Sequence, residues 1–404
     1  MKAYMDLTPL YKYARVPNTD MPFKARVLTP PDFAGTGVSG AVVERAILGS
    51  EFFKSRYDSG TLFPKLFCTF EETGLDEDLE IHNYTGQCPV RTFEINPVKG
   101  CSVGCAYCLV NDGIHDDPVV LLNYGKLIED NLRKQRETEH YYYFSPKTEA
   151  FCEASLQTGA AHDTLRAFIR HFEEYPGSKA RLFIASKAGT EALLYENKGD
   201  SILDLLKKLK GKVQFNTSLS IFPGDSIKVI EPYAGSIDSR LAAVNLCAEN
   251  GIMANSALVQ PILISLLTDD LLEAFFARLK DAGIINFKPE FLTACVENMA
   301  LLVQMLEPYD KDILRKTFTT YFKDANLGHI KQRARTAPAR EASLYWINRM
   351  TSVAERYGIS TSICFWVRQQ LNISEEKIPL INKNGFKCLG YQTRLFQPEV
   401  TYKE

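Results

Sequence analysis

The chain has 404 residues, with 47 Lys and Arg against 49 Asp and Glu, and a formal net charge of −2. This balance is ordinary for a globular protein and argues against a general nucleic-acid binder, which is usually basic. The sequence has no run of eighteen apolar residues and no signal-peptide core near its start, so we expect a cytoplasmic protein without a membrane span. Ten cysteines in a reducing compartment indicate metal ligation, redox chemistry or burial rather than disulfides.

Residues 1–90 show no regular alternation of strands and helices. Five prolines in the first 31 residues keep this part irregular, because proline lacks an amide donor and fixes its own backbone angle. One helix is expected at 40–54. We therefore predict that residues 1–90 form an N-terminal extension that packs on the main fold.

From residue 91 strands and helices alternate regularly. Strands are expected at 92–96, 140–145, 180–186, 213–220, 253–263 and 284–291. Helices are expected at 121–137, 160–174, 189–209 with a break at Gly199, 236–250 and 268–282. Such alternation produces parallel strands with right-handed crossovers. The predicted fold class is α/β, with residues 91–330 forming a partial (β/α)6 TIM barrel.

Residues 331–404 follow a different pattern. A basic run at 331–340 precedes an amphipathic helix expected at 341–358, and further segments follow at 359–371 and 382–396. Such a basic run is usually a solvated surface, although it would also suit a phosphate-bearing substrate. We predict a C-terminal capping segment that closes the open side of the barrel.

The stretch Glu94–Gly113 carries the clearest chemical signal, because Cys101, Cys105 and Cys108 form a C-x3-C-x2-C motif there. Three thiolates this close can bind three irons of a [4Fe–4S] cubane, which takes four cysteines when fully ligated. No fourth cysteine follows nearby, so one iron would keep a position open for an outside ligand. The motif follows a predicted strand, and barrel enzymes carry their catalytic residues on such loops.

The motif cysteines allow two other interpretations. The thiols could line one buried face of a helix, but Gly100 and Gly104 make this stretch a poor helix. A non-enzymatic iron–sulfur or zinc protein is the second alternative, with His115 as a fourth ligand seven residues after Cys108.

The cysteine motif, with Tyr107 directly before its last cysteine, resembles that of the radical SAM superfamily. The resemblance implies that S-adenosylmethionine (SAM) binds the open iron and is cleaved by the reduced [4Fe–4S] cluster. A 5′-deoxyadenosyl radical then abstracts hydrogen from a substrate. The resemblance also implies that Tyr107 packs on the adenine and that a low-potential donor, flavodoxin or ferredoxin, is a partner.

Later stretches extend the resemblance to the spore photoproduct lyase-like subfamily, over roughly residues 90–300. They are SPKTE at 145–149, SK at 186–187, Ser218 in the fourth strand, IEPYAGSIDSRLAAV at 230–244 and VQPI at 259–262. The cofactor-binding residues implied by the resemblance are Tyr107, Ser145, Glu149, Lys187, Ser218 and Arg240. Arg240 is implied to shape the pocket together with Glu231, and a lysine at a strand end suits the methionine carboxylate.

Two departures separate this chain from the lyase itself. The lyase carries a radical-quenching cysteine where this chain has Pro146, and a second tyrosine where this chain has Leu109. Repair of thymine dimers in DNA is therefore not expected. We expect the radical-generating half of the site to be shared and the substrate half to differ.

The substrate is predicted on indirect grounds. The near-neutral charge, the N-terminal extension and the C-terminal cap favour an extended ligand, a ribosomally synthesised precursor peptide remodelled by a splicease-type maturase. A small accessory peptide-recognition protein would then be a partner. The alternative is a radical SAM lyase or isomerase that acts on a nucleotide, nucleic acid or small metabolite. No membrane partner is expected.

Cys152 is the predicted catalytic cysteine outside the motif. It lies three residues after Glu149, on the connection that carries the quenching cysteine in the lyase. A thiol returns a hydrogen atom readily because its S–H bond is weak compared with most C–H bonds. The opposing interpretation is a small cysteine packed under the barrel rim, since free cysteines are often buried.

Overall fold

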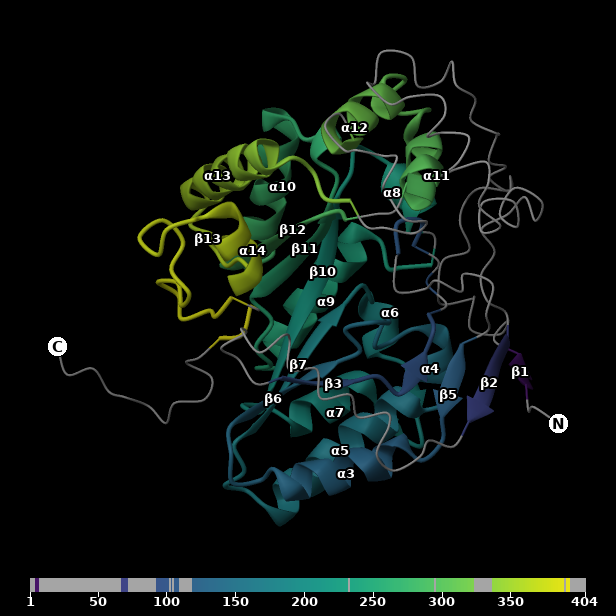
Figure 1. The fold of residues 1–404 in the computed structure, drawn as a ribbon. Coiled ribbons are helices and arrows are strands. Elements are labelled where there is room, and N and C mark those ends of the chain that lie inside the picture. Colours follow the sequence, from purple (N-terminus) through teal and green to yellow (C-terminus); the bar gives the residue numbers. More distant parts are fainter. Residues whose placement is uncertain are drawn as a thin grey trace.

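The structure is a computed structural model. It describes residues 4–6, 67–71, 92–101, 103, 105–108, 118–231, 233–293, 296–322, 336–388 and 390–392. The helix expected at 40–54 and the alternative ligand His115 lie outside these residues. Figure 1 shows a central curved sheet with helices packed along one side and a C-terminal segment along the other.

The central sheet has seven strands, and each adjacent pair is parallel. In spatial order they are β13 (Ser360–Thr361), β12 (Asn286–Phe291), β11 (Ser256–Ile262), β10 (Val213–Ile221), β7 (Ala180–Ser186), β6 (His140–Phe144) and β3 (Thr92–Ile95). Six of the strands match the six expected positions, so the α/β partial barrel is confirmed. The seventh, β13, comes from the predicted C-terminal cap and extends the sheet beyond β12.

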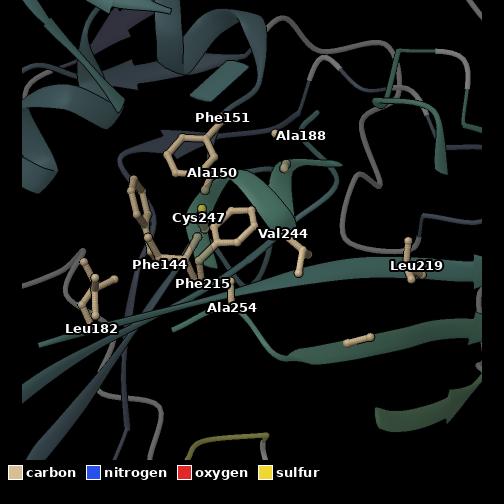
Figure 2. Packing of buried hydrophobic residues seen from close by; sticks show 14 of the residues in the cluster. Phe144, Ala150, Phe151, Leu182, Ala188, Phe215, Leu219, Val244, Cys247 and Ala254 are labelled. Carbon is tan, nitrogen blue, oxygen red and sulfur yellow. The ribbon is translucent and has the colours of Figure 1, made fainter. Parts of the chain in front are cut away.

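The outer face of the sheet packs against a layer of helices. They are α3 (Tyr124–Lys134), α5 (Ala160–Glu174), α7 (Ile202–Lys208), α9 (Ile237–Glu249), α10 (Asp269–Asp281) and α13 (Arg340–Arg356). Figure 2 shows Phe144 and Phe215 of the strands close to Cys247 and Val244 of α9. Burying one large apolar side chain contributes about 1.5–3 kcal/mol, so this layer holds the strands in place.

One expected helix is wrong in its middle part. Residues 189–209 form α6 (Thr190–Leu193), a hairpin of β8 (Glu196–Asn197) and β9 (Asp200–Ser201), and then α7. Lys198 and Gly199 both have positive φ angles, 54° and 84°. Two consecutive residues with positive φ form the tight turn that a two-residue hairpin needs, so the break at Gly199 is a hairpin rather than a kink.

The inner face of the sheet lines the barrel lumen and is closed at the amino ends of the strands. We call residues 381–392 the plug; residue 389 lies outside the description. Gln214 of β10 donates to the Gly390 carbonyl at 2.7 Å and accepts from the Gln392 amide at 2.8 Å. Tyr391 packs against Phe183, with ring centroids 4.3 Å apart. The lumen therefore opens toward the carboxyl ends of the strands.

The remaining described elements surround this barrel. A four-stranded sheet has the order β1 (Tyr4–Asp6), β2 (Phe67–Glu71), β5 (Val119–Leu121) and β4 (Val98–Lys99). The other helices are α4 (Glu153–Gln157), α8 (Ser226–Ile230), η4 (Ile264–Leu266), α11 (Val296–Leu306), α12 (Ile313–Phe322) and α14 (Phe365–Leu371). Among the described helices none is long and apolar enough to cross a membrane.

Candidate active site

The cysteine motif follows β3 and borders a cavity at the carboxyl ends of the parallel strands. Cys101, Cys105 and Cys108 all line this cavity, whose volume is about 600 Å³. The loop is fixed by local bonds, because the Cys108 amide donates to the Cys105 carbonyl at 3.1 Å and Ala106 donates to Ile230 at 2.9 Å. Ala106 and Tyr107 also pack in an apolar cluster with α11 and α12. We call this the cluster cavity.

The donor set fits a [4Fe–4S] cluster. In the described part of the chain, no three Cys, His, Asp or Glu side chains are placed to hold a single metal ion. A cubane does not require such a group, because each of its cysteines binds a different iron. All three motif cysteines line one and the same cavity.

Two of the motif thiols, Cys101 and Cys105, have pKa values well above the usual value for cysteine. The pKa of Cys105 is raised by burial and by the carboxylate of Glu231. The pKa of Cys101 is raised by its hydrogen bond with Cys152 and by burial. Metal binding must deprotonate such thiols, so loading of this site would release protons.

A buried charged network stands behind Tyr107. Its hydroxyl donates to Glu231, which also accepts from Ser220 at 2.7 Å and from Arg240. Glu231 and Arg240 are both almost fully enclosed. Burial acts to raise the pKa of Glu231, but Arg240 and Lys187 outweigh it and hold this pKa below its usual value. Glu231 is therefore an anion that fixes the Tyr107 hydroxyl.

Lys187 reaches into the cluster cavity from the end of β7. Its ammonium donates to the Ser218 hydroxyl at 3.1 Å and lies 3.9 Å from Glu231. The Lys187 carbonyl accepts from the Gly235 amide at 2.9 Å. A Cβ on Gly235 would lie 2.6 Å from the Gly189 nitrogen, so glycine is needed for this close approach of two loops.

Glu149 borders the cavity but is already occupied by protein donors. Its carboxylate accepts from the Lys187 amide at 2.7 Å, from the Phe151 amide at 3.2 Å and from the Ser186 hydroxyl. These bonds join the loop after β6 to the end of β7. Glu149 thus holds the backbone of Lys187, in addition to facing the cavity.

Ser145 lies at the cavity wall directly after β6. Its φ angle is 54°, an uncommon value for a residue with a side chain. Its amide donates to the Ile95 carbonyl at 2.7 Å, which ties the ends of β6 and β3 together. Strained backbone of this kind gathers at functional sites.

Cys152 lies beside the motif rather than inside the cluster cavity. It is 1% exposed, and its thiol hydrogen-bonds with that of Cys101. It lines a second cavity of about 660 Å³ between α4, α6 and α9, which shares Glu149 and Lys187 with the first.

The structure brings together eight of the ten predicted site residues. The cluster cavity is lined by Cys101, Cys105, Cys108, Tyr107, Ser145, Glu149, Lys187 and Ser218. Arg240 and Cys152 do not line it: Arg240 is 1% exposed and acts through Glu231 and the Ser218 carbonyl. The sequence reasoning missed Gln260 of β11, which lines the cavity; its place at the end of a parallel strand was the available signal.

Comparison with solved structures defines the class of fold. A point mutant of spore photoproduct lyase matches with a TM-score of 0.50 and 14% identity, over 77% of this chain and 84% of the lyase chain. A radical SAM methyltransferase from Sphaerobacter thermophilus matches with a TM-score of 0.39 and 15% identity, over 67% and 65% of the two chains. Methylornithine synthase matches with a TM-score of 0.34 and 11% identity, over 67% of this chain and 82% of the synthase chain.

The fold of this chain is therefore similar to that of spore photoproduct lyase. At 14% identity the similarity establishes the fold and not the reaction. Neither the family models nor the curated sequences compared with the chain give a match.

Proposed function

We propose that this protein is a radical SAM enzyme, which uses a [4Fe–4S] cluster and SAM to abstract a hydrogen atom from its substrate. The main support for this proposal is the set of residues that line the cluster cavity. Three thiols that leave one iron of a cubane open face the same space as a strand-end lysine and serine. The lyase-like fold supports the proposal, because it places this loop where barrel enzymes perform chemistry.

The protein residues would orient the cofactor and exclude water. Lys187, with Ser218 beside it, is suited to the methionine carboxylate because an ammonium is a compact point charge. Glu149 and Glu231 hold Lys187 by its amide and by its charge. When bound, the cluster and SAM supply the carbon-centred radical that starts the reaction.

We further propose that the substrate is a peptide, most simply a ribosomally made precursor. In the described part of the chain, three lysines at or near the carboxyl ends of the strands are each paired with a glutamate. The pairs are Lys147–Glu94 at 3.4 Å, Lys187–Glu231 at 3.9 Å and Lys288–Glu290 at 2.8 Å. A phosphodiester chain is bound by lysines and arginines that neutralise phosphates. Paired charges suit amides and single carboxylates better.

Anaerobic reconstitution tests the enzyme class. We expect about four irons and four sulfides per chain, and 5′-deoxyadenosine from SAM after reduction. Replacing Cys101, Cys105 and Cys108 by alanine should abolish both readouts. Cys247→Ala is the matched control, because Cys247 is packed between the sheet and α9. A normal cluster and normal cleavage in the triple variant would refute the assignment.

A hydrogen-transfer experiment tests the substrate class. Genes beside the coding sequence are searched for a short precursor peptide, which is then prepared with perdeuterated residues. Deuterium in 5′-deoxyadenosine would show that the peptide is the hydrogen donor. Deuterium transfer from a labelled oligonucleotide instead of the peptide would assign the nucleotide alternative.

A further inference from the structure

Strand β12 presents two charged residues to the barrel lumen. Phe287 belongs to the apolar layer under the helices, so Lys288 and Glu290 share the lumen face, because successive side chains of a strand alternate. Lys288 is in register with Leu258 of β11, and Leu258 is in register with Ser218 of β10. Two strand spacings put the backbone of Lys288 about 10 Å from that of Ser218. Lys288 therefore lies on the same inner face of the sheet as Leu258, two strands away from Ser218.

Lys288 is a buried cation with spare hydrogen-bond donors. It is 5% exposed, and among the described residues its ammonium donates to Glu290 alone, at 2.8 Å. An ammonium carries three donors, and a buried charge is stable only when it is well paired and hydrogen-bonded. The Glu290 side chain, in contrast, is 49% exposed. The ammonium of Lys288 is therefore enclosed and keeps hydrogen-bond donors that Glu290 does not use, whereas the carboxylate of Glu290 is open to solvent.

Two further groups act on the charge of Lys288. Burial acts to lower its pKa, but Glu290, Cys364 and Tyr143 act in the other direction, and the pKa lies above its usual value. Tyr143 also lines the cluster cavity. Cys364 directly precedes α14, which lies near β12 and β13 (Figure 1). It is half-buried, whereas Cys152, Cys247 and Cys388 are buried.

We propose that Lys288 binds a carboxylate of the substrate in the lumen, with the Cys364 thiol beside the bound group. This inference rests on the proposed function, since it places a substrate group on the wall next to the cofactor site. A carboxylate is favoured over a phosphate for a physical reason. One lysine matches a single negative charge, and Glu290 beside it would repel a doubly charged phosphate.

Alkylation of Cys364 tests the site without knowledge of the substrate. Holoenzyme is treated anaerobically with iodoacetate or with neutral iodoacetamide, and the Cys364 peptide is quantified by mass spectrometry. The ratio of the two rates is normalised to the same ratio for glutathione. Because Lys288 would attract the carboxylate of iodoacetate, Lys288→Met should lower the normalised ratio about three- to tenfold. Lys207→Met on the outer helix α7 should leave it unchanged.

A second variant keeps the test decisive if Lys288→Met does not fold. Glu290→Gln removes the competing carboxylate, so it should raise the ratio. An unchanged ratio in Glu290→Gln or in folded Lys288→Met would overturn the proposal and leave Lys288 as one half of a structural ion pair.

Competition distinguishes the two anion chemistries. Acetate should slow iodoacetate at Cys364 in the wild type and not in Lys288→Met, whereas protection by inorganic phosphate alone would overturn the carboxylate assignment. None of these measurements depends on SAM cleavage. The carboxylate site at Lys288 can therefore be refuted while the proposed radical SAM function holds, and the radical SAM function can be refuted while the carboxylate site holds.

Discussion

Replacing Arg240 by methionine should destabilise the protein strongly, although Arg240 does not face the cluster cavity. Its guanidinium donates to the Gly235 carbonyl at 2.6 Å, to the Ser218 carbonyl at 3.0 Å and to Glu231. Removing one partner of a buried ion pair costs about 3–5 kcal/mol, because the other charge stays buried. We therefore expect a loss of about 4 kcal/mol in the free energy of unfolding.

Urea unfolding of the reduced apoprotein, followed by far-UV circular dichroism, measures this loss. Arg278→Met is the matched control, because its partner Asp238 is solvent-exposed and an exposed pair contributes about 0–1 kcal/mol. The double variant Arg240→Met/Glu231→Gln should be more stable than Arg240→Met alone, since no uncompensated carboxylate remains. A loss for Arg240→Met no larger than that of the control would refute the reasoning.

Three further outcomes are expected. Lys187→Met and Glu149→Gln should each weaken SAM binding about 10- to 100-fold, the size of a charged hydrogen bond, and leave the iron content unchanged. Calorimetry measures the affinity and iron analysis the cluster content. Loss of iron with unchanged affinity for SAM would show that Lys187 and Glu149 are structural residues. Cys152→Ala should retain SAM cleavage but lose or divert the product, as seen by mass spectrometry, and unchanged product yield would remove Cys152 from the mechanism. Burial lowers the pKa of His162 in the folded protein. Below the unfolded pKa of about 6.5 the unfolded chain therefore binds a proton at His162 before the folded chain does. The free energy of unfolding then falls with pH, by up to about 1.4 kcal/mol per pH unit. His162→Leu should flatten the pH dependence of urea unfolding between pH 7 and 5, and an equally steep dependence would contradict this assignment.

The barrel was predictable because its strands and helices carry strong local signals. The helix expected at 160–174 matches α5, and Ser236 caps α9 by accepting from Ser239, as its residue type suggests. The region around Lys198 was predicted as helix because its apolar residues keep a helical spacing through what is a hairpin. The deciding feature there is a pair of positive φ angles, which a helical pattern does not reveal.

The candidate site was predictable to the extent that it sits in consecutive strand-end motifs. Lys187 directly follows β7 and Ser218 lies within the neighbouring parallel strand β10, so the sheet brings the two side chains within hydrogen-bond distance. Burial of individual side chains was not predictable in this way. Arg240 lies on a helix, and only the folded structure shows that its guanidinium points into the protein toward Glu231. The sequence also carries a signal at Lys288, a lysine between Phe287 and Pro289 in the buried first part of β12.

The plug has a consequence for the timing of folding. Gln214 contacts Gly390 across 176 residues of chain, and Tyr141 contacts Lys387 across 246. Contacts of such long range form slowly, because the entropy of closing a long loop is lost before they stabilise the fold. During synthesis the sheet and its outer helices can therefore assemble while the lumen is still open at the amino ends of the strands. The cysteine loop follows the first strand of the barrel, so its residues are synthesised long before the plug that closes the opposite end.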